Sequence, residues 1–197
     1  MTKRSAKISR KTAETTIDLT LNLDGSGLGE INTGVGFLDH MLDHLAKHSL
    51  ADLTIAAQGD THVDDHHTTE DVAICLGEAL SKSLGDKAGI KRYGSASVPM
   101  DEALANVTLD LSGRSAVVFD APLSQGKIGT FDCQLVEEFI RALSRTAGIN
   151  IHINVPNGSN DHHIAEAIFK ALAMALRDAV AIDPDRGDSI PSTKGSL

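Results

Sequence analysis

The stretch DHHTTE at residues 65–70 opens an apolar run, and the chain repeats it as DHHIAE at residues 161–166. In each copy, two adjacent histidines and a glutamate follow an aspartate that can cap the start of a helix. Residues four apart share a helix face, whereas the second histidine is turned roughly 100° away from the first. The first histidine and the glutamate of each copy can therefore hold one ion, and the second histidine must point elsewhere. Two such helix starts indicate a metal site with nitrogen and oxygen ligands. The alternative is that these histidines and glutamates are ordinary solvated residues at a helix start, and that explanation would have to apply to both copies.

The order of predicted elements repeats with the motif. Residues 102–113 overlay residues 14–25 without a gap, and both segments alternate apolar and polar residues as a strand does. Each half reads as strand-strand-helix-strand-helix, and strands with helices on one side indicate an α+β layered fold. The chain is thus predicted to be a single domain, residues 1–197, made of two tandem pseudo-repeats and an irregular tail. The expected ranges are about 1–90, 91–182 and 183–197, and the helices are expected at 37–48, 66–84, 131–146 and 162–180.

Composition excludes several partners. The formal net charge is −9 at pH 7, so neither nucleic acid nor an anionic membrane surface would meet a general basic stripe. Hydrophobic residues make up 41% of the chain, but no run reaches the length of a membrane span, and no apolar segment follows the short basic start. The two cysteines, Cys75 and Cys133, lie far apart without a CxxC pattern. They are expected to be reduced core residues of a cytoplasmic protein.

The duplication works as a filter on the candidate ligands. Aligning the halves leaves four pairs of positions that keep a metal-binding residue type: 40/138, 66/162, 67/163 and 70/166. Helix geometry then predicts two related sites, because the turned-away histidine of one helix can complete the site of the other. The sites are His66, Glu70, Glu138 and His163, and His162, Glu166, His40 and His67. Four imidazole and carboxylate ligands suit six-coordinate Mn²⁺ with two open positions, with Zn²⁺ or Fe²⁺ as alternatives. Spacing leaves open whether the ligands meet within one chain or between subunits.

Five motifs in order give the chain a specific resemblance over nearly its whole length. They are FLDHMLDHL (37–45), DHHTTED (65–71), VPMDEA (98–103), DHHIAEA (161–167) and IPSTKG (190–195). The chain resembles the imidazoleglycerol-phosphate dehydratases, hydro-lyases of histidine biosynthesis. That resemblance implies a duplicated fold like ribosomal protein S5 domain 2 and two Mn²⁺ ions per active site. It also implies a 24-subunit shell with active sites at subunit interfaces. Many members carry His where this chain has Glu138, which adds negative charge here.

The same resemblance implies roles for residues outside the metal set. Glu14 and His48 are expected to be catalytic and to contact a small phosphorylated imidazole substrate. The residues expected around its phosphate or polyol are Arg92, Arg114, Ser192, Thr193 and Lys194. Without the resemblance, Glu14 would read as a solvated strand residue, and Arg92 and Lys194 as surface charges. His44 is left undecided between the site wall and the helix surface.

The expected reaction explains why metals and acids would be needed. The proton lost in the dehydration sits beside no carbonyl, so direct elimination would be slow; a dimanganese-bound imidazolate would supply the electrons instead. Two rival functions remain open at this point. One is another dinuclear-metal hydrolase, in which the ions activate water. The other is a metal-storage shell, although storage bundles place Glu-x-x-His on four helices and this chain has strand signals instead.

Overall fold

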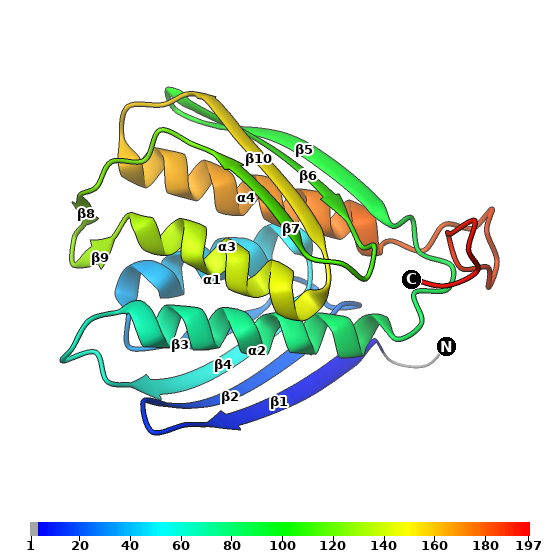
Figure 1. Cartoon of the computed structure of the whole chain (residues 1–197), viewed down its shortest axis with the longest axis horizontal. Helices are drawn as coiled ribbons and strands as arrows, with labels where there is room; N and C mark the ends of the chain where they lie inside the picture. The colour runs from blue at the N-terminus through cyan, green and yellow to red at the C-terminus, as the bar shows by residue number, and fades with distance from the viewer. Residues whose placement is uncertain (1–3) are drawn as a thin grey trace.

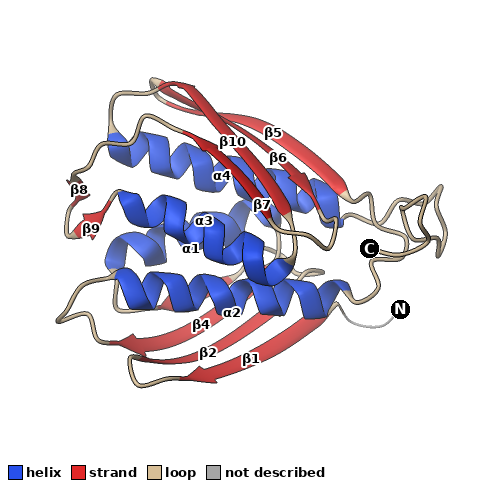
Figure 2. Ribbon diagram, in the orientation of Figure 1, coloured by secondary structure: helices blue, strands red, loops and turns tan. Residues whose placement is uncertain are grey.

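The computed structural model describes residues 4–197, in which a layer of four helices lies between two four-stranded sheets (Figure 1). The first half contains β1 (Ser5–Lys11), β2 (Thr15–Asn22), β3 (Gly29–Asn32), α1 (Gly36–Ser49), β4 (Asp52–Gly59) and α2 (His66–Leu84). The second half contains β5 (Tyr93–Met100), β6 (Ala103–Asp110), β7 (Ala116–Asp120), β8 (Lys127–Ile128), β9 (Phe131–Asp132), α3 (Gln134–Ala147), β10 (Asn150–Asn157) and α4 (Asp161–Val180). Figure 2 shows the sheets as the two outer layers. None of the described helices is long and apolar enough to span a membrane.

The two sheets have the same topology. Their strand orders are β1-β2-β4-β3 and β5-β6-β10-β7, and in each the last strand of the order runs parallel to its neighbour. The registers correspond as well, since Leu21 faces Leu53 in the first sheet and Leu109 faces Ile151 in the second. The predicted α+β fold built from a tandem duplication is therefore confirmed.

Each four-stranded sheet has one strand more than the sequence pattern predicted. β1 and β5 form edge strands that pair antiparallel with β2 and β6. The first half is therefore strand-strand-strand-helix-strand-helix, and the second half adds the short β8 and β9 before its first helix. Their side chains are largely exposed or half-buried, and an edge strand of that kind lacks the apolar alternation that marks a half-buried strand. The helix expected from residue 131 begins at Gln134, because residues 127–132 form the short β8–β9 hairpin.

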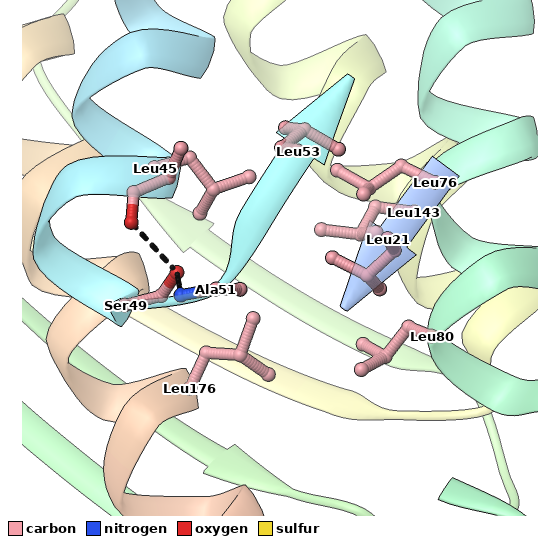
Figure 3. Close-up of a pocket in the computed structure, with 10 residues that line it drawn as sticks. Leu21, Leu45, Ser49, Ala51, Leu53, Leu76, Leu80, Leu143 and Leu176 are labelled. Carbon is pink, nitrogen blue, oxygen red and sulfur yellow. Dashed lines mark hydrogen bonds between the residues drawn. The ribbon is translucent and has the colours of Figure 1, made fainter. Parts of the chain in front are cut away.

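The core lies where the helices meet the inner faces of the sheets. Alternate residues of β2 point inward and are buried, and α2 packs on α3 while α1 packs on α4, which joins the halves. A cavity of about 20 Å³, lined mostly by leucines, remains within this core (Figure 3). The hydroxyl of Ser49 at its wall bonds to the backbone of Ala46 and Ala51. An apolar cavity of this size has no polar partners for water and offers no chemistry.

The starts of the two motif helices differ from the expected caps. Asp65 occupies the N-cap position of α2, but its side chain makes no capping bond; Asp64 Oδ1 instead accepts from the His66 N–H at 2.8 Å. In α4 the N-cap is Asn160, whose side chain accepts from the His162 N–H at 2.9 Å. In both cases the capping oxygen comes one residue earlier than predicted, and the histidines lie in the first helical turn.

A buried polar triad ties the β1–β2 hairpin to α2. Asp71 is 6% exposed, accepts from Thr15 Oγ1 at 2.5 Å and pairs with Arg10 at 2.9 Å. At the corresponding places of the second half, where β5, β6 and α4 repeat the geometry, the residues are Val98, Ala103 and Ala167. The same fold therefore packs this corner once with polar and once with apolar side chains.

Asp71→Ala is expected to lower the free energy of unfolding by about 2 kcal/mol, because it leaves Arg10 and the buried Thr15 hydroxyl without their acceptor. The triple variant Arg10→Val, Thr15→Ala, Asp71→Ala copies the second half and should regain at least half of that loss. Urea unfolding of the metal-free proteins at one fixed protein concentration measures both. A triple variant no more stable than Asp71→Ala would show that the apolar solution does not transfer between the halves.

Candidate active site

The first constellation is the α4 cluster, which consists of His40 from α1 and His162 and Glu166 from α4. The Nε2 atoms of His40 and His162 lie 3.2 and 3.1 Å from Glu166 Oε2. His162 and Glu166 meet because they are four residues apart on one helix face, as the motif predicted. His40 reaches them because α1 packs against α4. The rings of Phe37 and His162 meet edge to face, with centroids 5.2 Å apart.

The second oxygen of Glu166 is also engaged. Lys170, one turn further along α4, donates from Nζ to Glu166 Oε1 at 2.5 Å, and His44 Nε2 lies 3.4 Å from the same oxygen. Glu166 is only 5% exposed. Burial would raise its pKa, but the Lys170 ammonium and the adjacent imidazoles outweigh burial and lower the pKa to about 2. Glu166 is therefore an ionised carboxylate at neutral pH, and its negative charge is largely shielded from solvent.

The second constellation, the α2 cluster, consists of His66 and Glu70 from α2 and Glu138 from α3. Here too a His and a Glu four residues apart meet a residue of the other half, because α2 packs against α3. Arg145, two turns after Glu138, donates from its guanidinium to Glu70 Oε1 at 3.0 Å. The two clusters are thus repeat-related, with Glu138 standing where the α4 cluster has His40.

Both clusters fit a divalent metal ion by their donor chemistry and spacing. In each, one ligand atom from every member lies within 4.8 Å of the others. Imidazole nitrogen with carboxylate oxygen is the donor set of Mn²⁺, Fe²⁺ and Zn²⁺ sites. A buried carboxylate such as Glu166 needs a positively charged partner, and here the Lys170 ammonium group binds one of its oxygens.

Each cluster holds three of the four ligands predicted for its site. His163, predicted for the α2 cluster, binds Glu102 through Nδ1 at 2.7 Å. His67, predicted for the α4 cluster, binds Asp60 through Nδ1 at 3.0 Å. Neither ring joins a cluster of its own chain, because the adjacent histidines point about a quarter turn away from the first ones.

Glu14 lies at the β1–β2 turn, close to the start of α2. Its Oε1 is 3.7 Å from His67 Nε2, outside hydrogen-bond distance. Beside it is an open polar hollow of about 280 Å³, lined by residues 12–16, which run from the β1–β2 turn into β2, and by residues 58–60 and 62 at and just after the end of β4. The Glu14 carboxylate thus faces the open hollow beside His67, a predicted metal ligand, and is not hydrogen-bonded to that histidine.

The three histidines of α1 form a stripe that leads away from the α4 cluster. The rings of His40 and His44 meet edge to face at 4.5 Å, and those of His44 and His48 stack at 5.7 Å. Burial lowers the pKa of both His44 and His48, so both favour the neutral ring. His44, left undecided by the sequence, touches Glu166 and so belongs to the wall of the cluster.

The predicted phosphate residues lie at the other end of the molecule. Arg92 binds Asp110 with two hydrogen bonds of 2.7 and 3.1 Å and donates to the Pro191 carbonyl at 2.8 Å, which anchors the tail. Arg114 is exposed in the β6–β7 turn, near which the chain ends. The tail residues are half-buried Ser192 and exposed Thr193 and Lys194. Figure 1 shows this tail at the end of the molecule opposite to the starts of α2 and α4, so one chain does not bring the basic and metal-type groups together.

A model of the imidazoleglycerol-phosphate dehydratase family matches residues 33–176, which include both clusters. A relative from Ruegeria pomeroyi with that name is 59% identical over 194 residues, covering 98% of this chain and all of the relative. The chain belongs to the imidazoleglycerol-phosphate dehydratase family. A Granulibacter bethesdensis relative of the same name is 58% identical over 98% of this chain and 99% of its own. The predicted family and the predicted class of enzyme, a hydro-lyase, are therefore confirmed.

Solved structures of this dehydratase family share the fold. The crystal structure of the dehydratase from Staphylococcus aureus has a TM-score of 0.83 and 44% identity, covering 91% of this chain and 99% of that one. The structure of IGPD from Pyrococcus furiosus in complex with (S)-C348 has the same TM-score and 38% identity, covering 96% of this chain and all of that one.

Several site residues of this dehydratase-family chain escaped the sequence reasoning. Lys170 and Arg145 each bind one oxygen of a cluster carboxylate, and Asp60 and Glu102 each bind a histidine. Lys170 could have been found, because it lies four residues after Glu166 on the same helix face. Asp60 and Glu102 gave no such signal, since they lie in turns whose proximity to the helices depends on the tertiary fold.

Proposed function

We propose that this chain dehydrates imidazoleglycerol phosphate to imidazole acetol phosphate in the cytoplasm and that two Mn²⁺ ions per active site serve the reaction. The observation that carries the proposal is the pair of repeat-related His/Glu clusters in a chain of this family. His40, His162 and Glu166 would hold one ion, and His66, Glu70 and Glu138 the other. Bound divalent ions would make the substrate's imidazole ring more acidic and supply the positive charge that stabilises it as an electron donor.

The chain's own acid–base group is Glu14. Dehydration removes a hydroxyl from the carbon beside the ring and a proton from the next carbon, and the resulting enol becomes the ketone. A general acid must protonate the departing hydroxyl, and a base must take the carbon proton. Glu14 faces an open hollow beside His67 and can serve at least one of these steps. His48, whose pKa burial lowers, is the second candidate base.

The phosphate would bind the basic groups around the tail. Arg114 and Lys194 are exposed and present cationic donors, and Ser192 and Thr193 add hydroxyls. Arg92 has its guanidinium shared between Asp110 and Pro191, so it holds the tail in place and contributes positive charge. Localised Arg and Lys groups are what a dianionic phosphate needs in a protein of net charge −9.

We propose that complete sites form between copies of the chain, in a shell of 24 subunits. Two observations favour self-association. The residues proposed to bind metal and those proposed to bind phosphate lie at opposite ends of the folded molecule (Figure 1). In addition, His67 and His163 lie outside the clusters of their own chain. A second copy could bring each missing group to each incomplete site. Light scattering of the purified protein, with and without Mn²⁺, measures the assembly.

The deciding experiment offers metal-stripped protein three substrates with and without added Mn²⁺. Imidazoleglycerol phosphate should yield imidazole acetol phosphate, detected by mass spectrometry and proton NMR, only when Mn²⁺ is present. A simple phosphomonoester and a dipeptide should remain uncleaved, and their hydrolysis would support a dinuclear hydrolase instead. Metal analysis excludes storage if about two ions bind per chain, one for each cluster.

A further inference from the structure

The second histidine of each pair is held by a carboxylate through the same ring atom. His67 Nδ1 lies 3.0 and 3.2 Å from the two oxygens of Asp60, and His163 Nδ1 lies 2.7 Å from Glu102 Oε2. The two carboxylates do not occupy equivalent positions: Asp60 follows β4, whereas Glu102 is in the β5–β6 turn. The two halves therefore reach the same contact by different routes, although the two three-residue clusters follow the repeat.

Glu102 is fixed from both sides. Its Oε1 accepts from the backbone N–H groups of Ser159 and Asn160 at 3.1 and 2.9 Å, which leaves Oε2 for His163. Both oxygens of Glu102 therefore act as acceptors, one for the two backbone N–H groups and the other for the imidazole. By repeat position Glu102 corresponds to Glu14, which has no such partners and faces the open hollow. Within residues 4–197, the Glu14 side chain accepts no hydrogen bond and lies 3.7 Å from His67 Nε2, whereas Glu102 accepts directly from His163 Nδ1.

This contact determines which ring nitrogen can bind a metal ion. A carboxylate at Nδ1 requires a proton there, so in the neutral ring the lone pair resides on Nε2. The Nε2 atoms have no hydrogen-bond partner within the described chain. The carboxylates nearest to them, Glu14 for His67 and Asp101 for His163, are 3.7 and 3.8 Å away. Metal-bound histidines usually donate their other N–H to such a carboxylate.

We infer that Glu102 and Asp60 are positioning residues that keep His163 and His67 as Nδ1–H tautomers, so that each Nε2 is available as the fourth ligand of a metal ion bound by another copy of the chain. The inference rests on the proposed function, because it needs ions at the α2 and α4 clusters. It assigns Glu102 a role that differs from that of its repeat partner Glu14.

Glu102→Gln tests the role of Glu102 without removing the backbone contacts. The amide oxygen can still accept from Ser159 and Asn160, which turns the amide NH₂ toward His163 Nδ1 and favours the Nε2–H tautomer. Mn²⁺ affinity at the sites that use His163 should fall roughly 10- to 100-fold, while the sites that use His67 keep theirs. Competition with a chelator of known affinity, followed by the electron paramagnetic resonance of free Mn²⁺, resolves the two classes.

Asp101→Asn is the matched control, because it removes a negative charge from the same turn without touching Nδ1. It should change Mn²⁺ affinity much less than Glu102→Gln. The tautomer is read separately by ¹⁵N solid-state NMR of histidine-labelled, metal-free protein at alkaline pH, where imidazoles are neutral. Glu102→Gln should convert one ring from the Nδ1–H to the Nε2–H form.

The outcomes separate the inference from the function on which it rests. Unchanged Mn²⁺ affinity or an unchanged tautomer in Glu102→Gln, with the wild type binding Mn²⁺, would overturn the positioning role. A wild-type protein that binds no Mn²⁺ would overturn the proposed metal centre instead, and the NMR experiment would still decide the tautomer.

Discussion

Removing divalent metal with a chelator should lower the turnover of imidazoleglycerol phosphate by at least about 10³-fold, and added Mn²⁺ should restore it. The magnitude follows from Lewis-acid stabilisation worth several kcal/mol, at roughly 1.4 kcal/mol for each factor of ten. Turnover is expected to return in proportion to bound Mn²⁺ up to about two ions per chain, because each cluster offers one set of ligands. Product formation and metal content are measured on the same samples.

Two controls make this result specific. Mg²⁺ prefers oxygen ligands and gives up its water reluctantly, so the imidazole-containing clusters should respond to it weakly. Glu166→Gln should remove about one bound Mn²⁺ per chain and leave the α2 cluster loaded, since the two clusters share no ligand. Full turnover in protein shown by metal analysis to be free of divalent ions would refute the proposed mechanism.

The sequence was sufficient for the parts of the site that depend on local geometry. The pairs His66/Glu70 and His162/Glu166 meet because four residues bring them back to the same helix face. Their partners Glu138 and His40 were found through the duplication, which restricted the candidates to positions kept in both halves. That filter works because both halves build the same helix–sheet layer, so equivalent residues reach equivalent places.

The sequence was insufficient where the contact depends on a turn or on another copy of the chain. Glu102 reaches His163 from the hairpin turn that joins β5 to β6. The sequence did not predict this hairpin, because β5 is an edge strand with too little apolar alternation to be recognised as a strand. The sequence also could not show that Arg92 binds Asp110 and Pro191, because nothing in their spacing places the tail beside β6. The assignment of His67 and His163 to their sites stays a prediction, since one chain leaves them apart from the clusters.

Glu14→Gln is expected to lower kcat by about 10²-fold or more, the usual contribution of one general acid–base group, without loss of bound Mn²⁺. The amide has the size of the carboxylate but neither gives nor takes a proton, so substrate binding should change little. Metal content should not change, because Glu14 belongs to neither cluster. Thr15 and Asp71 should still hold the turn, which keeps the substituted side chain beside the hollow.

The matched control is Glu30→Gln, which makes the same substitution at an exposed position of β3 in the same sheet. It should turn over substrate like the wild type. Steady-state kcat and KM with saturating Mn²⁺, together with metal analysis, distinguish the possible causes of a loss. A fall in kcat at constant metal content places Glu14 in proton transfer, whereas a fall that follows lost Mn²⁺ would make it a support of the metal centre. A wild-type kcat in Glu14→Gln would remove this residue from the mechanism and leave His48 as the candidate base.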